Sequence, residues 1–219
     1  MRRSKNDAEK TKQLLVQAAC EVFYREGVVR ATLEQIAREA GLTRGALYWH
    51  FNNKVDILDE LFQWIMPNVD VLQTNMLVWP TECYWDNLIA HFMEFFQELQ
   101  EDSSFRKFFT VMHLKCEMTE SNAQVIELLR KYELIWERQV EGVISMAVSK
   151  KVLSEQTDVV LTSKLLRSHL LGIIVVFLGD VEEKGLTETN YQVAIVQLQH
   201  MLRVLKDHTI LKQGTISTL

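Results

Sequence analysis

Glycine, proline and cysteine are scarce in this chain of 219 residues, which contains 8, 2 and 3 of them. Glycine and proline interrupt helices, and few segments alternate polar with apolar residues, so their scarcity predicts an all-α fold. The three cysteines, Cys20, Cys83 and Cys116, are odd in number and form no C-x-x-C pair. They are typical of reduced thiols in a cytoplasmic protein and argue against a disulfide-stabilised secreted fold.

The sequence also lacks a secretory leader and a long apolar run. Its first residues, M-R-R-S-K-N-D-A-E-K, are charged, and no apolar segment follows them directly, which argues against secretion. The most apolar run, Leu170 to Leu178, is far shorter than the about 20 residues needed to span a bilayer. We therefore expect a cytoplasmic protein with no membrane partner.

Catalytic signatures are missing as well. The sequence contains no G-x-S-x-G, H-E-x-x-H, P-loop or G-x-G-x-x-G motif. An enzyme is nevertheless the alternative from another class, because His113, Cys116 and Glu117 lie within five positions and could be drawn as a Cys/His or metal site. Three such residues on an apolar helix are a weak signal, so we expect no enzyme activity, no metal site and no cofactor.

The charge is divided unevenly along the chain, whose net charge is −5. Residues 1–54 contain ten Lys or Arg and six Asp or Glu, a balance of +4, which leaves −9 for residues 55–219. A basic N-terminal part is what a surface facing phosphates requires, while an acidic remainder should stand away from nucleic acid.

Three short helices are predicted in the N-terminal part. Apolar residues at helical spacing indicate a first helix over 7–26, stopped by Gly27. Thr32 opens a second helix, with Gln35 completing a capping box, and Gly41 provides the turn before Thr43 caps the third. Two short helices joined by a tight glycine turn are typical of a helix-turn-helix that inserts its second helix into the major groove of DNA.

The rest of the chain reads as a larger helical domain. We expect helices over 55–66, 85–100, 105–118, 125–148, 157–182 and 188–207, about nine in total. The predicted domains are a DNA-binding domain, residues 1–54, and a ligand-binding and dimerisation domain, residues 55–219.

The third helix carries the candidate DNA-contacting side chains. If Leu47 and Phe51 face the core, Gly45 and Trp49 lie on the opposite side, with Arg44 and Tyr48 flanking them. The alternative is an ordinary surface helix with buried aromatic residues. We expect Arg44 to reach guanine and Gly45 to allow close approach of the backbone. Phosphate contacts are expected from Thr32, Thr43, Tyr48, His50 and Lys54.

The run A-G-L-T-R-G-A-L-Y-W-H-F-N-N-K resembles the N-terminal signature of the TetR family of one-component transcriptional regulators. This resemblance implies a three-helix DNA-binding domain, a helical ligand-binding domain, and a homodimer on a near-palindromic double-stranded DNA operator. It also implies that Arg44, Gly45 and Tyr48 read bases. On the same resemblance, the backbone would be held by Thr32, Thr43, Trp49, His50 and Lys54.

The segment Phe108–Glu117, F-F-T-V-M-H-L-K-C-E, resembles a segment of AcrR-like repressors of multidrug efflux pumps. This implies a repressor that a bulky apolar or aromatic inducer releases from an efflux operon. The alternative is a regulator of the same family that answers to a metabolite or signalling compound. Met66 stands where some AcrR-like proteins carry an acidic side chain, although Asp70 lies one turn on. The predicted ligand-contacting residues are Met66, Asp70, Phe92, Phe109, Met112, His113, Trp136, Val140 and His169.

The aromatic and methionine residues outside the N-terminal domain allow two interpretations. Stripes at helical spacing usually form plain core, but aromatic and methionine side chains also line adaptable apolar sites. His113 and His169 sit on otherwise apolar helical faces, where a histidine is more often structural than ligand-binding.

The two closing helices favour dimerisation. Over 188–207, apolar residues exceed one stripe, and the preceding helix is apolar almost all round from Leu165 to Leu178, with Gly172 allowing close approach. A four-helix interface with a second copy would cover these faces. The alternative is burial of both helices within one subunit.

Overall fold

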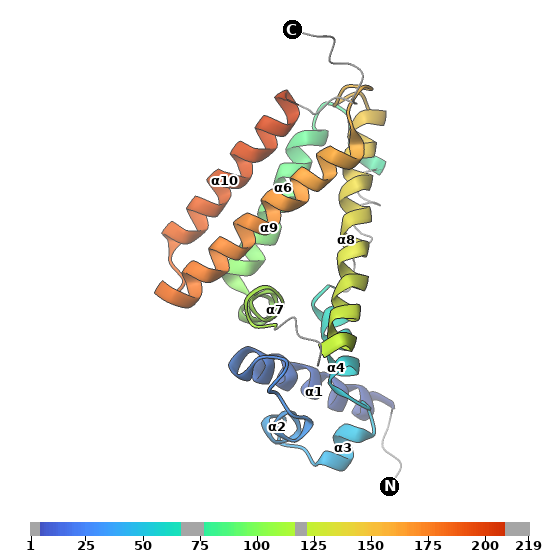
Figure 1. Cartoon of the computed structure of the whole chain (residues 1–219), viewed down its shortest axis with the longest axis vertical. Coiled ribbons are helices and arrows are strands. Elements are labelled where there is room, and N and C mark those ends of the chain that lie inside the picture. The colour runs from blue at the N-terminus through green and yellow to red at the C-terminus, as the bar shows by residue number, and fades with distance from the viewer. Residues whose placement is uncertain (1–4, 67–76, 117–121, 209–219) are drawn as a thin grey trace. The chain divides into compact units, whose positions relative to one another are not determined.

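The computed structural model describes residues 5–66, 77–116 and 122–208. Within these ranges the chain forms nine α-helices and no strand (Figure 1), which confirms the predicted all-α fold with its N-terminal helix-turn-helix. The helices are α1 (Lys5–Glu26), α2 (Leu33–Glu39), α3 (Arg44–Tyr48), α4 (Lys54–Ile65), α6 (Tyr84–Glu101), α7 (Ser103–Leu114), α8 (Ala123–Ser149), α9 (Val159–Lys184) and α10 (Glu188–Asp207).

The caps predicted for the helix-turn-helix are confirmed. The Thr32 hydroxyl accepts a hydrogen bond from the backbone N–H of Gln35, and the Gln35 side chain accepts one from the Thr32 backbone. The Thr43 hydroxyl accepts one from the backbone of Ala46 in the same way. Gly27 and Gly41 both have positive φ angles, +78° and +66°, a conformation that glycine adopts without strain.

One compact unit comprises residues 1–67 and 102–131. In it, α1 packs against α2, α4 and α7, and α2 packs against α3. Phe62 of α4 meets Phe108 of α7 edge to face, with ring centroids 4.8 Å apart. The predicted inward residues of the helix-turn-helix are buried: Ile36, Ala37, Leu47 and Phe51.

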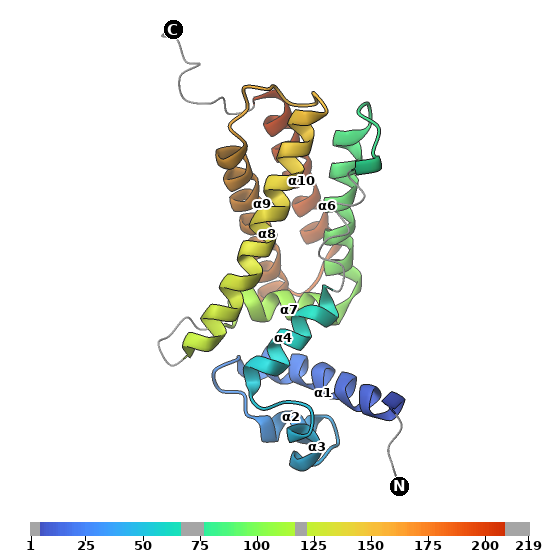
Figure 2. The ribbon, with the colours of Figure 1, turned by 90° about the vertical axis from the view of Figure 1, so that its right-hand side faces the viewer.

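The other compact unit comprises residues 68–101 and 132–219. Its helix α10 packs against both α9 and α6, which run alongside it (Figures 1 and 2). Two adjacent aromatic residues at the start of α6 tie it to its neighbours. The Tyr84 hydroxyl donates to the carbonyl of Val143 in α8 at 2.8 Å, and the Trp85 indole N–H donates to the carbonyl of Leu202 in α10 at 3.1 Å. The predicted boundary between residues 54 and 55 stays a prediction.

Helix α7 differs most from its predicted range of 105–118. It begins at Ser103, because the Asp102 carboxylate accepts hydrogen bonds from the backbone N–H groups of Ser104 and Phe105. It ends at Leu114, and Lys115 leaves the helical conformation with φ −122° and ψ 6°. The predicted end at Met118 was therefore wrong, although Met118 itself lies outside the described residues.

Helix α9 is the one helix in the described ranges that is long and apolar enough to cross a bilayer by length and composition. Of the most apolar 18-residue stretch of α9, 33% is buried within this chain. A single helix of this kind is weak evidence for a membrane span, because packed helices of soluble proteins have the same composition. Its uncovered apolar side chains are Val160, Leu161, Leu171 and Val176.

Candidate nucleic-acid interface

The exposed face of α3 carries an arginine held by its neighbours. The Arg44 guanidinium lies 3.5 Å from the Tyr48 hydroxyl and 5.7 Å from the centre of the Tyr48 ring. The hydrogen bond to Tyr48 raises the pKa of Arg44, and the Glu34 carboxylate at 4.0 Å adds to the effect. Arg44, Tyr48 and Glu34 are all exposed, so their contacts orient the charged guanidinium without removing it from solvent.

The other residues predicted on this face of α3 are exposed or half-buried, so a bound molecule could contact them. Trp49 is 81% exposed, an unusual position for an indole, and it caps the carboxyl end of α3. Gly45 is exposed, and a Cβ built on it would meet only the Thr43 hydroxyl, at 3.9 Å. Among the described residues, therefore, no other atom lies within 4 Å of this position, which leaves room for another molecule beside the backbone there. His50 is half-buried beside Phe51.

Thr32 and Thr43 are the N-caps of α2 and α3, so each combines a hydroxyl group with the N-terminus of a helix. Both side chains are exposed while they cap α2 and α3. Backbone N–H groups at the start of a helix attract anions, so these two termini suit phosphate oxygens. Together with Arg44, Tyr48 and Trp49 they form what we call the reading surface. Its contacts with DNA stay a prediction.

Lys54 has a structural role that its spacing alone did not reveal. Its ammonium group donates hydrogen bonds to the carbonyls of Val28 and Val29, at 2.8 and 2.7 Å, in the turn that follows α1. Partial burial lowers the pKa of Lys54. An ammonium has three donors, so one N–H remains for the phosphate contact that the sequence predicts.

Substituting Lys54 with methionine separates these two roles. Loss of two charge-assisted hydrogen bonds is expected to lower the free energy of unfolding by about 1–3 kcal/mol, as measured by urea denaturation. Lys184→Met is the matched control, because Lys184 is exposed on α9 and pairs with Asp180 at 2.8 Å, and such surface pairs contribute little. A phosphate contact alone would leave stability unchanged and lower the salt dependence of DNA binding by about one counterion per subunit.

Residues that sequence analysis missed join α3 to α4. The Asn53 side chain accepts hydrogen bonds from the backbone N–H groups of Val55 and Asp56, at 2.7 and 3.0 Å. The Asp56 carboxylate accepts in return from the backbone and side-chain N–H groups of Asn52. The signal was present in the sequence, since Asn is a preferred N-cap residue and Asp is favoured in the first turn of a helix.

The residues predicted to contact a ligand fall in both compact units, and each group is described by itself. In the first unit, Phe109 is buried on α7 and its ring stacks with that of exposed His113, with centroids 6.0 Å apart. Met66 caps the end of α4, and Met112 is half-buried.

In the second unit, Phe92 of α6 and Val140 of α8 are buried, and Trp136 is half-buried. His169 is exposed on α9, with Nδ1 2.9 Å from the Leu165 carbonyl oxygen. Asp70 lies outside the described residues. Contact of either group with a ligand stays a prediction.

The described residues contain no group of three or more His, Cys, Asp or Glu side chains that could hold a metal ion. Cys116 and His113 are both near the end of α7, and Glu117, the third residue of the alternative site, lies outside the described residues. Burial among apolar side chains raises the pKa of the Cys20 thiol to about 12.

Comparison with known proteins relates most of the chain to regulators. The family described as "Bacterial regulatory proteins, tetR family" matches residues 15–61, from α1 into α4. The HTH-type transcriptional regulator TtgR of Pseudomonas putida is 30% identical over 196 residues, which cover 84% of this chain and 91% of TtgR.

Two solved structures share the fold over nearly their whole length. NalD, the secondary repressor of the MexAB-OprM multidrug efflux pump in Pseudomonas aeruginosa, is 29% identical, with a TM-score of 0.74 over 91% of this chain and 97% of NalD. The complex of SmeT with triclosan has a TM-score of 0.74 at 24% identity, over 94% of this chain and 93% of SmeT. SmeT is the repressor of the Stenotrophomonas maltophilia multidrug efflux pump SmeDEF.

Proposed function

Because this chain belongs to the tetR family of bacterial regulatory proteins, we propose that it is a cytoplasmic repressor that binds a near-palindromic operator as a homodimer. The observation that carries this proposal is the reading surface, where Arg44, Tyr48 and Trp49 stand exposed on a capped two-helix scaffold. Arg44, Gly45 and Tyr48 read base edges in this proposal, and Thr32, Thr43, Trp49, His50 and Lys54 contact the sugar–phosphate backbone.

Uncovered apolar residues support the homodimer. The side chains of Val193, Val196 and Val204 on α10 remain exposed, as do four apolar side chains of α9. A Cβ at Gly172 would meet no atom of the described residues within 4 Å, which leaves room for a second helix to approach. A symmetric partner that presents the same two helices would bury both faces. Binding of the dimer to successive major grooves requires its two copies of α3 to lie about 34–36 Å apart.

We further propose that a bulky apolar or aromatic molecule releases this repressor and that the regulated operon encodes a multidrug efflux pump. One support is the similarity to NalD and SmeT, which are repressors of such pumps. The other is the set of aromatic and methionine side chains in residues 55–219, since such side chains line adaptable apolar sites. In this mechanism, ligand binding moves α4, whose first residue is Lys54, and so changes the spacing of the two reading surfaces. The ligand needs only to favour the non-binding conformation.

Release by a drug-like molecule is testable with triclosan, which SmeT binds. Saturating triclosan is expected to weaken binding of the dimer to the DNA upstream of its own gene by about five- to 150-fold, the usual range of coupling between two sites. Fluorescence anisotropy of a labelled DNA fragment measures the change.

A thermal melt controls for denaturation. A true ligand raises the melting temperature of the free protein while it lowers operator affinity, whereas a denaturing additive lowers both. If several drug-like compounds raise the melting temperature without releasing DNA, or fail to bind, the efflux proposal is wrong and a metabolite becomes the better candidate.

A further inference from the structure

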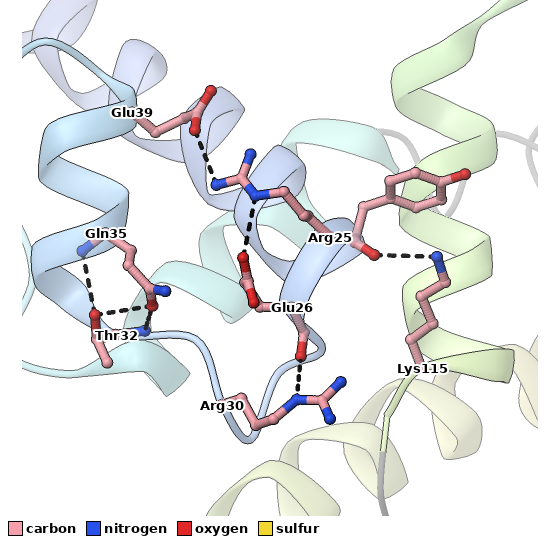
Figure 3. Close-up of polar contacts among 8 residues, drawn as sticks. Arg25, Glu26, Arg30, Thr32, Gln35, Glu39 and Lys115 are labelled. Atoms are coloured by element: carbon pink, nitrogen blue, oxygen red, sulfur yellow. Dashed lines mark hydrogen bonds and ion pairs between the residues drawn. The ribbon is translucent and has the colours of Figure 1, made fainter.

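The carboxyl end of α1 and the turn that follows it are held by two lysines that lie far from them in the sequence. Lys115, just after α7, donates a hydrogen bond to the carbonyl of Tyr24 at 3.1 Å, and its ammonium lies 3.8 Å from the centre of the Tyr24 ring (Figure 3). Lys54 donates to the carbonyls of Val28 and Val29. The last carbonyls of a helix lack helical partners and form the negative end of its dipole, so cations stabilise this end.

The backbone of Lys115 also lies against this helix end. A Cβ built on Gly27 would stand 3.2 Å from the Lys115 carbonyl oxygen, so a side chain at this position would push against the end of α7. Two turns earlier on α7, the Lys107 ammonium contacts both carboxylate oxygens of Glu21 at 2.7 Å. Helix α7 therefore holds α1 along its second half, and Lys115 is the last point of that contact.

The held segment leads directly into the reading surface. After Gly27, the turn is closed by hydrogen bonds from the Ala31 backbone N–H to the Gly27 carbonyl and from the Arg30 side chain to the Glu26 carbonyl. Thr32, the cap of α2, is the next residue (Figure 3).

A second connection runs from the same helix end to the far end of α2. The Arg25 guanidinium bridges Glu26 and Glu39, at 3.1 and 3.0 Å (Figure 3). A displacement of the α1 terminus would thus reach α2, against which α3 packs, through the turn to Thr32 and, more weakly, through the exposed Arg25 ion pairs.

We propose that Lys115 is a positioning residue for DNA recognition, which holds the carboxyl end of α1 and thereby sets the placement of α2 and α3. This role differs from the ligand contacts predicted for Phe109, Met112 and His113 on α7, and it rests on the proposed DNA-binding function. The ammonium and the Tyr24 ring make the contact specific, because a cation over an aromatic face combines attraction with a preferred geometry.

The test uses full-length Lys115→Met, which keeps the aliphatic stem and removes the charge. Operator affinity at 25 °C is expected to fall about fivefold or more, within the range for residues that act through a packed network. The salt dependence of binding should stay unchanged because no phosphate contact is lost. Lys115→Arg should restore most of the affinity, since it keeps a cation that donates hydrogen bonds and stacks on aromatic rings.

Lys150→Met is the matched control. Lys150 also donates from its ammonium to a backbone carbonyl, that of Trp79 at 2.6 Å, but in the other compact unit. The variant Lys150→Met should therefore bind the operator with the affinity of the wild type.

If Lys115→Met lowers stability but binds the operator like the wild type, Lys115 is merely structural and the proposal is overturned. A salt dependence reduced by about one counterion per subunit would make Lys115 a phosphate contact and overturn the proposal as well. Should the methionine variant not fold, Lys115→Gln, which keeps an N–H donor, takes its place with the same expected outcomes. Wild-type protein that binds no operator would instead contradict the proposed function.

Discussion

Replacing Val196 with glutamate is expected to split the homodimer and to weaken operator binding by at least about a hundredfold. Val196 is 62% exposed on α10, beside the exposed Val193. In a symmetric interface each subunit contributes the same surface, so one substitution places two carboxylates in the buried contact. Each unpaired buried charge costs several kcal/mol, more than a dimer of ordinary affinity can offset. A monomer then retains only the contacts of one half-site.

Sedimentation equilibrium at micromolar concentration measures the first effect, and an operator titration measures the second. Val78→Glu is the matched control, because Val78 is 80% exposed in the same compact unit but lies outside α9 and α10. It should remain dimeric and bind normally. If Val196→Glu stays a dimer with wild-type operator affinity, the subunits must meet through another surface, and the apolar faces of α9 and α10 need a different explanation.

The helix-turn-helix was predictable because its determinants are local. Thr32 caps α2 through Gln35, three residues away, and Thr43 caps α3 through Ala46. Such bonds depend on residue type and short spacing, which a sequence displays directly. Burial of Leu47 and Phe51 followed from helical periodicity alone.

The contacts that hold this motif in place could not be predicted in the same way. Lys54 bonds to carbonyls 25 and 26 residues away, and Lys115 to one 91 residues away. A lysine ammonium can donate a hydrogen bond to any nearby oxygen, so its residue type does not indicate which carbonyl it reaches. The early end of α7 was not predictable either: Lys115 lies outside the helical conformation, and its ammonium donates to the distant Tyr24 carbonyl.

The candidate ligand site shows a related limit. Phe109 and Phe92 are both buried on apolar helices, as periodicity predicts, yet they belong to different compact units. Periodicity indicates which face of a helix is apolar but not which neighbouring helix covers it. His169 was placed on an apolar face by its neighbours in sequence and is exposed in the structure.

Substituting Arg44 with alanine is expected to weaken binding to the specific operator at least about thirtyfold. A bidentate contact between arginine and guanine contributes about 1–3 kcal/mol, and a dimer loses one in each half-site. In the free protein Arg44 bonds to Tyr48 and lies near Glu34, but these contacts are exposed and weak, so exchanging them for a base costs little. The variant should therefore lose base contacts while its fold remains intact.

The pattern of the loss distinguishes base readout from charge. Against a set of operators altered one base pair at a time, Arg44→Ala should lose discrimination at one symmetric pair of positions and keep it elsewhere. Arg130→Ala removes the same charge from an exposed arginine of α8 and should change neither affinity nor specificity. An equal loss of affinity for every sequence, with a smaller salt dependence, would mean that Arg44 contacts phosphate. Base recognition would then have to come from Tyr48 and from the close approach that Gly45 permits.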